Sequence, residues 1–331
     1  MPRFSPTMVP ATPVSIAQAA ALVADGDVCA FPTETVYGLG ADATQEAAVL
    51  RIYELKGRPR RNPLIVHVPD VAWAMRVCAA FPPLASRLAE RHWPGPLSLV
   101  LPRGAHIPDI VSAGLPSVAV RVPAHPVALS LLRAARRPLA APSANRSESV
   151  SPTTAEHVLR SLPGVPLILD GGPCPLGIES TVLDLTQPRP RLLRPGALPL
   201  RDLLSDVPDL ELPSCHFDEV PGPLPSPGLL TRHYAPKATL HLVSNPEARF
   251  VAGLPSPTGL LTHAPLPQLD GLCDVVERLP ATPEAYAVDL YAALHRLDDQ
   301  GMRSIVVLAP PRNEDWRAIF DRLERAASKA A

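Results

Sequence analysis

Cations and polar residues are concentrated in the segment 56–67, which reads KGRPRRNPLIVH. Its four cations are Lys56, Arg58, Arg60 and Arg61. Gly57 and Pro59 interrupt the charged run and exclude a regular helix across it, so we expect the charges on a shaped turn that leads into a strand. Such a turn could receive an anion. A solvated basic loop is the alternative, because isolated charge clusters are usually hydrated surface.

Other polar residues follow short apolar segments that are expected to be strands. Thr35 lies in the segment 32–40, PTETVYGLG, and Ser143 opens the segment 143–154, SANRSESVSPTT. Polar residues at the end of a buried strand often form a ligand site in α/β folds. Capped turns into the following helices are the alternative interpretation for both segments.

Arg121 interrupts a run of β-branched residues at 117–123, SVAVRVP. A lone charge within a central strand is costly to bury. The guanidinium should therefore either extend to an edge of the sheet or bind an anion, and both alternatives remain open on the residues alone.

These residues together supply positive charge and hydrogen-bond donors. The candidate set comprises Lys56, Arg58, Arg121, Arg194, Thr35, Ser143, Ser151, Ser180, Asn62, Asn145 and His67. The chain has no G-x-x-x-x-G-K-[ST], H-E-x-x-H or G-x-S-x-G motif, which excludes a P-loop, a zincin site and a nucleophile elbow. A site without a protein nucleophile suits adenylyl or phosphoryl transfer, in which the protein positions phosphates and stabilises charge while the substrates react.

The composition indicates a globular protein of two domains, with 331 residues of which 46% are hydrophobic and 19% charged. The formal net charge of −1 excludes a general polycation, so any contact with nucleic acid must come from a local basic patch. The five cysteines include no C-x-x-C pair, which favours a reducing compartment. Because we see no signal peptide and no run of ~20 apolar residues, we expect a cytoplasmic protein that does not cross a membrane.

Hydrophobic periodicity and turn residues predict alternating strands and helices in the first part of the chain. Helices are expected at 14–25, capped by Ser15, and at 47–57, 71–80, 84–93, 125–136, 153–162 and 198–206. Strands are expected at 28–31, 64–68, 94–102, 117–123, 139–142, 167–170, 182–185 and 192–194. After a proline- and glycine-rich stretch at 219–239, strands at 240–244, 258–263 and 304–309 and helices at 283–299 and 315–328 predict a small α/β domain with a parallel sheet. We assign no chemistry to that domain.

The order of several motifs resembles the YrdC family, in its long, two-domain branch of threonylcarbamoyl-AMP synthases. The motifs are PTETVYGLGADA, KGRPRRNPLIVHV, WPGPLSLVL, AVRVPAHP, APSANRS, GIESTVLD, LLRPGA and HYAPK. The resemblance implies a YrdC-like α/β domain with a twisted mixed sheet at 10–212, and a smaller, Rossmann-like α/β domain at 239–331. Between them, the linker at 213–238 would act as a lid over the active site.

The resemblance also implies an activity and a role for each candidate residue. L-threonine, bicarbonate and ATP would give L-threonylcarbamoyl-AMP and pyrophosphate, and the product would pass to a threonylcarbamoyl-transferase complex that modifies tRNA, with weak tRNA contact at most. The residues expected to bind ATP are Lys56, Arg58, Asn62, Ser117, Ser143, Asn145, Ser151, Arg194 and Tyr234, with Lys56 and Arg58 as the catalytic pair. The residues expected to bind threonine are Thr35, His67, Arg121, Ala141 and Ser180. Mg²⁺ would be held chiefly by the nucleotide, without protein metal ligands.

Two other functions compete with this interpretation. YrdC-type domains can present a concave basic face, so an RNA-binding or ribosome-associated module without adenylate synthesis is the main alternative. Near-neutral charge and uncharged polar residues argue against it. Carbamoyl transfer of the hydrogenase-maturation type is disfavoured because the chain lacks zinc-finger cysteines in register.

Overall fold

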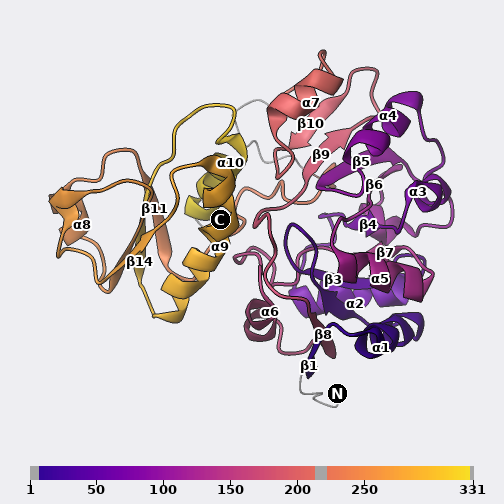
Figure 1. The fold of residues 1–331 in the computed structure, drawn as a ribbon, viewed down its shortest axis with the longest axis horizontal. Coiled ribbons are helices and arrows are strands. Elements are labelled where there is room, and N and C mark those ends of the chain that lie inside the picture. The colour runs from indigo at the N-terminus through magenta and orange to yellow at the C-terminus, as the bar shows by residue number, and fades with distance from the viewer. Residues whose placement is uncertain (1–6, 213–221, 329–331) are drawn as a thin grey trace.

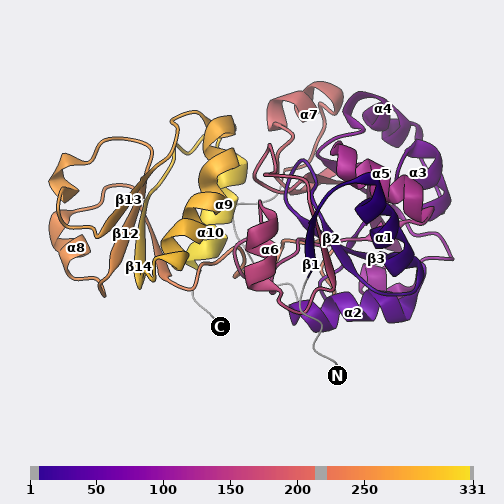
Figure 2. The ribbon, with the colours of Figure 1, turned by 60° about the horizontal axis from the view of Figure 1, so that its bottom comes forward.

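The computed structural model describes residues 7–212 and 222–328. Figure 1 shows two α/β units side by side, the first formed by residues up to 212 and the second by residues from 239 onward. Figure 2 shows that two long helices, α9 (Pro283–Asp299) and α10 (Arg317–Ala327), lie between the second sheet and the first unit. The interface between the units is therefore built largely from these helices.

The first unit is organised around a sheet with the strand order β1-β8-β2-β3-β7-β4-β6-β5-β9-β10. Its strands are β1 (Thr7–Pro10), β2 (Cys29–Phe31), β3 (Gly38–Asp42), β4 (Ile65–His67), β5 (Leu97–Pro102), β6 (Ser117–Arg121), β7 (Leu139–Ala140), β8 (Leu167–Asp170), β9 (Thr181–Asp184) and β10 (Arg191–Arg194). Strand β4 pairs with β6 in parallel, whereas β5 pairs with β6 in antiparallel. The predicted mixed sheet is thus confirmed.

Helices cover both faces of this sheet. They are α1 (Pro13–Ala24), α2 (Glu46–Lys56), α3 (Val71–Val77), α4 (Pro83–His92), α5 (Pro126–Ala135), α6 (Ala155–Ser161) and α7 (Leu200–Asp206). Successive residues of β2 belong to different cores: Phe31 packs with Val23 of α1 and Leu132 of α5, whereas Ala30 lies in the core that contains Ile52 of α2. Side chains alternate between the faces of a strand, so this division shows that the sheet is buried on both sides.

The second unit has a four-stranded sheet in the order β11-β14-β12-β13, and every pair in it is parallel. Its strands are β11 (Thr239–Val243), β12 (Thr258–Thr262), β13 (Val275–Arg278) and β14 (Ser304–Leu308), and its short helix is α8 (Ala248–Ala252). Parallel neighbours joined by helical crossovers agree with the predicted Rossmann-like arrangement.

Two local predictions were wrong, and several short elements were not predicted. Thr12, not Ser15, caps α1: the Thr12 side chain accepts from the Ser15 amide, and the Ser15 hydroxyl accepts from the Thr12 amide at 2.9 Å, as in a capping box. Lys56 is the last residue of α2 and not part of the turn, which begins at Gly57 in the left-handed conformation. The short elements β1, β3, β13 and α8 were not predicted. Strands β1 and β13 and helix α8 are largely exposed and give little periodic signal, whereas β3 contains Gly38, Gly40 and Asp42, residue types that are uncommon in strands.

None of the helices in residues 7–212 and 222–328 combines the length and the apolar character that crossing a bilayer requires.

Candidate active site

A cavity lies at the carboxyl ends of two parallel strands. His67 ends β4, Arg121 ends β6, and the two residues are direct partners in the sheet register. The cavity, of about 50 Å³, brings together many of the predicted residues. Those that line it are Thr35, Arg58, His67, Arg121, Ala141, Ser143, Ser180, Arg194 and Tyr234. Residues scattered over two hundred positions therefore converge at one edge of the sheet, as expected for an α/β ligand site.

Arg121 is buried and held by three groups on the side of the cavity predicted for threonine. Its Nε donates to the Gly95 carbonyl at 3.1 Å, and its Nη1 donates to the Thr35 hydroxyl at 3.1 Å. Its Nη2 lies 2.6 Å from a carboxylate oxygen of Glu34, which is itself buried. The guanidinium does not extend to a sheet edge, and its buried charge is paired with Glu34, so its role as a receptor for a ligand anion stays a prediction.

His67 adds a neutral imidazole to the same side. Burial and the neighbouring Arg121 charge lower the pKa of His67 to about 3, so the ring is uncharged near neutral pH. Its Nδ1 is buried without a hydrogen-bond partner among the described residues, and the ring packs edge-on against Phe31. A neutral imidazole can donate or accept a hydrogen bond with a ligand without repelling the Arg121 charge.

Lys56 and Arg58 organise the loops beside the cavity. Lys56 Nζ donates to the Ser143 carbonyl at 2.6 Å and to the Asn145 carbonyl, while Arg58 donates to the carbonyls of Asn62 and Pro63. Burial lowers the pKa of Lys56 well below its usual value and that of Arg58 to about 10. Both charges are thus removed from water and face carbonyl dipoles. Among residues 7–212 and 222–328, neither cation forms a hydrogen bond or an ion pair with a carboxylate.

Several polar atoms around the cavity are buried without partners in the described part of the chain. They include both side-chain amide atoms of Asn62, Oδ1 of Asn145, Nδ1 of His67 and the Tyr234 hydroxyl. Buried polar atoms are nearly always hydrogen-bonded in folded proteins. Because these unpaired atoms belong to residues predicted to bind substrates, they are suitable contacts for a polar ligand.

The described part of the linker, residues 222–238, passes over the cavity. Pro227, Gly228, His233 and Tyr234 line it, and the Pro227 carbonyl accepts from Arg194 at 3.2 Å. Gly228 has φ +86°, and a Cβ there would lie 2.7 Å from the Tyr234 hydroxyl, so both conformation and space require glycine. Residues 213–221 of the predicted lid lie outside the described residues.

Not every predicted residue reaches the cavity. Ser117 begins β6, at the opposite end of the strand from Arg121, and pairs with Pro102. Ser151 is buried beside the cavity wall, where its hydroxyl donates to Glu179 at 2.6 Å. Arg60 and Arg61, from the original basic run, are exposed. Lys56, Asn62 and Asn145 do not line the cavity either, and the roles predicted for all five residues remain predictions.

Sequence reasoning assigned no role to several residues that support the site, namely Glu34, Ser98, Glu179, His233, Tyr291 and Arg322. Glu179 and Glu34 each adjoin a predicted residue in the sequence, so that proximity was a usable signal. Tyr291 and Arg322 belong to the second unit, and no local pattern connects them to the first. The assignment of no chemistry to that unit therefore left out two side chains that hold Glu179.

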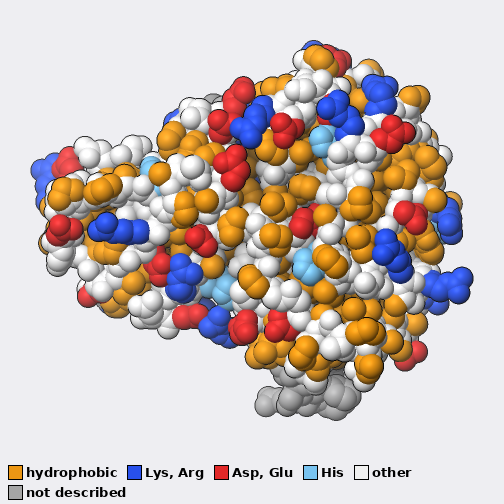
Figure 3. All heavy atoms as spheres, in the orientation of Figure 1, with side chains coloured by type: hydrophobic (Ala, Val, Ile, Leu, Met, Phe, Trp, Pro, Cys, Tyr) orange, Lys and Arg blue, Asp and Glu red, His pale blue; other side chains and the backbone are white. Residues whose placement is uncertain are grey.

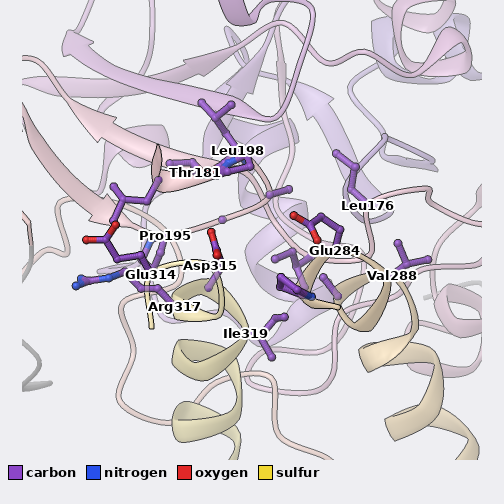
Figure 4. A pocket seen from close by; sticks show the side chains of 18 of the residues that line it. Leu176, Thr181, Pro195, Leu198, Glu284, Val288, Glu314, Asp315, Arg317 and Ile319 are labelled. Atoms are coloured by element: carbon purple, nitrogen blue, oxygen red, sulfur yellow. The ribbon is translucent and has the colours of Figure 1, made fainter. Parts of the chain in front are cut away.

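A larger cavity, of about 260 Å³, lies between the two units and is shown in Figure 4. Apolar residues such as Leu176, Leu198, Val288 and Ile319 dominate its walls. None of the predicted substrate-binding residues lines it. Its size alone does not make it the reactive site, because it lacks the convergent cations and unpaired donors of the smaller cavity.

The chain is similar to known proteins in both sequence and structure. Residues 21–196 match the family described as telomere recombination, and residues 204–328 match the family described as the threonylcarbamoyl-AMP synthase C-terminal domain. The threonylcarbamoyl-AMP synthase of Pyrococcus abyssi is 39% identical over 93% of each chain. That of Bacillus subtilis is 40% identical over 94% of this chain and 92% of its own. The crystal structure of P. abyssi Sua5 complexed with L-threonine aligns with a TM-score of 0.89 at 37% identity, covering 98% of this chain and 97% of the other.

Proposed function

The chain belongs to the threonylcarbamoyl-AMP synthase family, and we propose that the smaller cavity is its active site. The protein is an enzyme that forms L-threonylcarbamoyl-AMP for the N6-threonylcarbamoyladenosine modification of tRNA. The observation that carries the location of the site is the convergence of Arg58, Arg121 and Arg194 in the wall of one cavity, with Lys56 buried beside it against the Ser143 carbonyl. Cations are what this reaction needs, because two anionic substrates must approach each other.

The two ends of the cavity suit different substrates. Arg121, with Thr35, His67, the Ala141 backbone and Ser180, would receive L-threonine through its carboxylate and hydroxyl. Lys56, Arg58 and Asn62 would receive the triphosphate of ATP, with Ser143, Asn145, Ser151 and Arg194 around the nucleotide. This division is supported by the unpaired polar atoms of Asn62, Asn145 and His67.

The reaction then needs positioning more than protein nucleophiles. The threonine nitrogen combines with bicarbonate to give a carbamate and water, and a carbamate oxygen attacks the α-phosphorus of ATP while pyrophosphate leaves. Lys56 and Arg58, as the proposed catalytic pair, would stabilise the charge that develops on the phosphates during this displacement. Holding the bound reactants in line supplies much of the rate enhancement through proximity alone.

Magnesium would accompany the nucleotide and supply further charge neutralisation on the phosphates. Within residues 7–212 and 222–328 no three His, Cys, Asp or Glu side chains form a metal site. The cavity carboxylate Glu179 already accepts hydrogen bonds from Ser151, Tyr291 and Arg322. A donor set of cations and hydroxyls therefore fits an ion held by phosphate oxygens and not by the protein.

The linker supports the role of a lid. Tyr234 and Gly228 of the linker line the cavity, and with the linker in this position about 50 Å³ is free within it. Water exclusion would protect the carbamate and the mixed anhydride, which both hydrolyse readily. We therefore propose that residues 222–238 move away when ATP enters and return before adenylation.

The proposed partners are ATP, bicarbonate and a downstream threonylcarbamoyl-transferase complex, with weak tRNA contact at most. The four cysteines in the described residues, Cys29, Cys78, Cys174 and Cys273, are free thiols. Free buried thiols support a reducing compartment, and we propose the cytoplasm.

Pyrophosphate release tests the proposal. The purified protein should release pyrophosphate from ATP and Mg²⁺ only when both threonine and bicarbonate are present, and a chelator in excess should stop the release. Release that ignores threonine would contradict the proposed site chemistry. An RNA-binding module would instead bind tRNA with a steep salt dependence and show no threonine-dependent release. Figure 3 shows acidic and basic side chains interspersed on one face of the molecule, without a continuous basic surface there.

A further inference from the structure

Glu179 is a buried carboxylate in the wall of the active-site cavity, and its partners come from both units. One of its oxygens accepts from the Ser151 hydroxyl at 2.6 Å. The other accepts from the Tyr291 hydroxyl and from Arg322 Nε, each at 3.0 Å. Tyr291 belongs to α9 and Arg322 to α10, so the second unit provides two of the three groups that hold this carboxylate.

This carboxylate presents an electrostatic difficulty for the proposed nucleotide site. Burial alone would raise its pKa, but the charges of Arg322 and Arg194 and the Ser151 hydrogen bond lower the pKa of Glu179 below its usual value. Glu179 is thus an anion beside Ser151 and Arg194, two residues predicted to surround ATP. An uncompensated anion at this position would repel the phosphates.

Arg322 is placed to compensate the negative charge of Glu179 and also to contact the linker. Its side chain is 1% exposed, and its Nη1 donates to the Pro195 carbonyl at 2.6 Å, next to Arg194 in the chain. Its guanidinium carbon lies 5.2 Å from the centre of the Tyr234 ring, within range of a cation–π contact. The ring of Tyr234 also stacks on Tyr291 with centroids 5.8 Å apart. One arginine therefore contacts both the cavity wall and the residue that closes the cavity.

We propose that Arg322 is a positioning residue of the nucleotide site, supplied by the second unit, whose charge neutralises Glu179 and whose guanidinium supports Tyr234 in the closed linker. The proposal rests on the proposed function, because it concerns the ATP end of that site. It predicts that the second unit sets the affinity for nucleotide and contributes much less to the affinity for threonine.

Attachment of the two units to each other does not depend on Arg322 alone. His157 of α6 stacks on His295 of α9 with ring centroids 3.8 Å apart, and Arg160 pairs with Asp299 at 2.7 Å. Arg201 reaches Asp315 at 3.3 Å on the other side of the interface. Loss of Arg322 should therefore change the site while the units remain associated.

The test compares three variants with the wild-type enzyme. R322Q removes the charge, R322K keeps it on a different group, and E179Q/R322Q replaces the ion pair by two neutral amides. R317Q is the matched control, since Arg317 begins the same helix but lines the larger interdomain cavity of Figure 4. For each protein, KM values for ATP and threonine are measured by pyrophosphate release, binding of a non-hydrolysable ATP analogue by calorimetry, and melting temperature by circular dichroism.

We expect R322Q to raise the KM for ATP by about tenfold to a hundredfold and the KM for threonine by no more than about threefold, because Glu179 loses its ion-pair partner and keeps only the Ser151 and Tyr291 hydrogen bonds. Asp321, the other carboxylate beside Arg322, keeps its pair with Arg325. The double variant should regain most of the ATP affinity, and R322K and R317Q should stay within about threefold of wild type. If R322Q does not fold, R322K and the double variant carry the test, and a tenfold loss of ATP affinity in both would overturn the proposal.

Two further results would also overturn it: ATP affinity unchanged in R322Q, or no recovery in the double variant. A wild-type protein that fails to bind the ATP analogue would refute the proposed function itself, which the calorimetric arm distinguishes from a failure of the Arg322 role.

Discussion

Replacing Arg121 with alanine should weaken threonine binding far more than ATP binding. The guanidinium is 3% exposed and lies in register with His67, at the end of the cavity opposite to Lys56 in the proposed division. Truncating one partner of a buried, charge-assisted pair costs about 2–4 kcal/mol, which corresponds to a rise in the threonine KM of roughly 30-fold to several hundredfold. The KM for ATP should change by no more than about threefold.

The same substitution has a stability effect that must be separated from the binding effect. Arg121 lies 2.6 Å from Glu34, so R121A leaves this buried carboxylate unpaired and should destabilise the fold by about 3–5 kcal/mol. The double variant E34Q/R121A removes the unpaired charge, and it should regain most of the stability without regaining threonine affinity. Denaturant unfolding and pyrophosphate-release kinetics on both variants measure the two effects independently.

A matched control is available on the same sheet. Arg137 pairs at 3.1 Å with Asp42, which is fully buried at the end of β3, but neither residue lines the cavity. R137A should therefore lower stability while leaving both KM values within about twofold. If R121A raises the KM values for threonine and ATP equally, or if E34Q/R121A regains threonine affinity, the assignment of Arg121 to the threonine carboxylate is wrong.

Three further predictions address other parts of the site. Lys56→Ala should raise the KM for ATP by roughly 30-fold or more and change that for threonine much less, as measured by pyrophosphate release, because it removes a buried charge beside the proposed triphosphate. Tyr234→Phe should raise the KM for ATP about 3- to 10-fold without lowering the melting temperature, since the Tyr234 hydroxyl has no partner in the described residues. Burial lowers the pKa of His157 to about 3 and that of His295 to about 4, so below pH 6.5 the unfolded chain binds protons that the folded chain excludes. The free energy of unfolding should therefore fall as the pH drops from 6.5 toward 4, and His295→Asn should make the slope shallower by up to about 1.4 kcal/mol per pH unit in denaturant titrations.

The helices and strands predicted best are those whose own residue pattern is enough to specify their type and their ends. Helix α9 spans 283–299, as predicted, because its apolar residues recur at helical spacing and Pro283 marks its first turn. The strands that end at His67 and Arg121 were also recognisable, since runs of β-branched residues are bounded by proline. The general behaviour of α/β sheets predicts that polar residues at the carboxyl ends of strands gather at one site. It does not predict which residues pair with each other across the sheet.

The contribution of the second unit could not be predicted in the same way. Helix α10 is amphipathic, and its charged residues share one face, which in such a helix normally points to solvent. In the structure Asp321, Arg322 and Arg325 are buried nonetheless. Their burial depends on how two separately folded units pack, and Arg322 meets Glu179 across 143 positions of sequence. No periodic pattern within either segment indicates that contact.

The charges in the cavity explain why these residues are kept together. Lys56, Arg58, Arg121, Arg194 and Arg322 are all buried in or beside the cavity, where the buried carboxylates of Glu34, Glu179 and Asp321 oppose them. Burial lowers the pKa values of Lys56, Arg58 and Arg194, which means that the protein alone holds these cations at a cost in free energy. An anionic ligand would turn this unfavourable free energy into a favourable one, because each buried cation then interacts with an opposite charge in a medium of low polarity. Under the proposed function, the site would be most stable when it holds both a carboxylate and a triphosphate, and the excess of cations would offset the repulsion between those two anions.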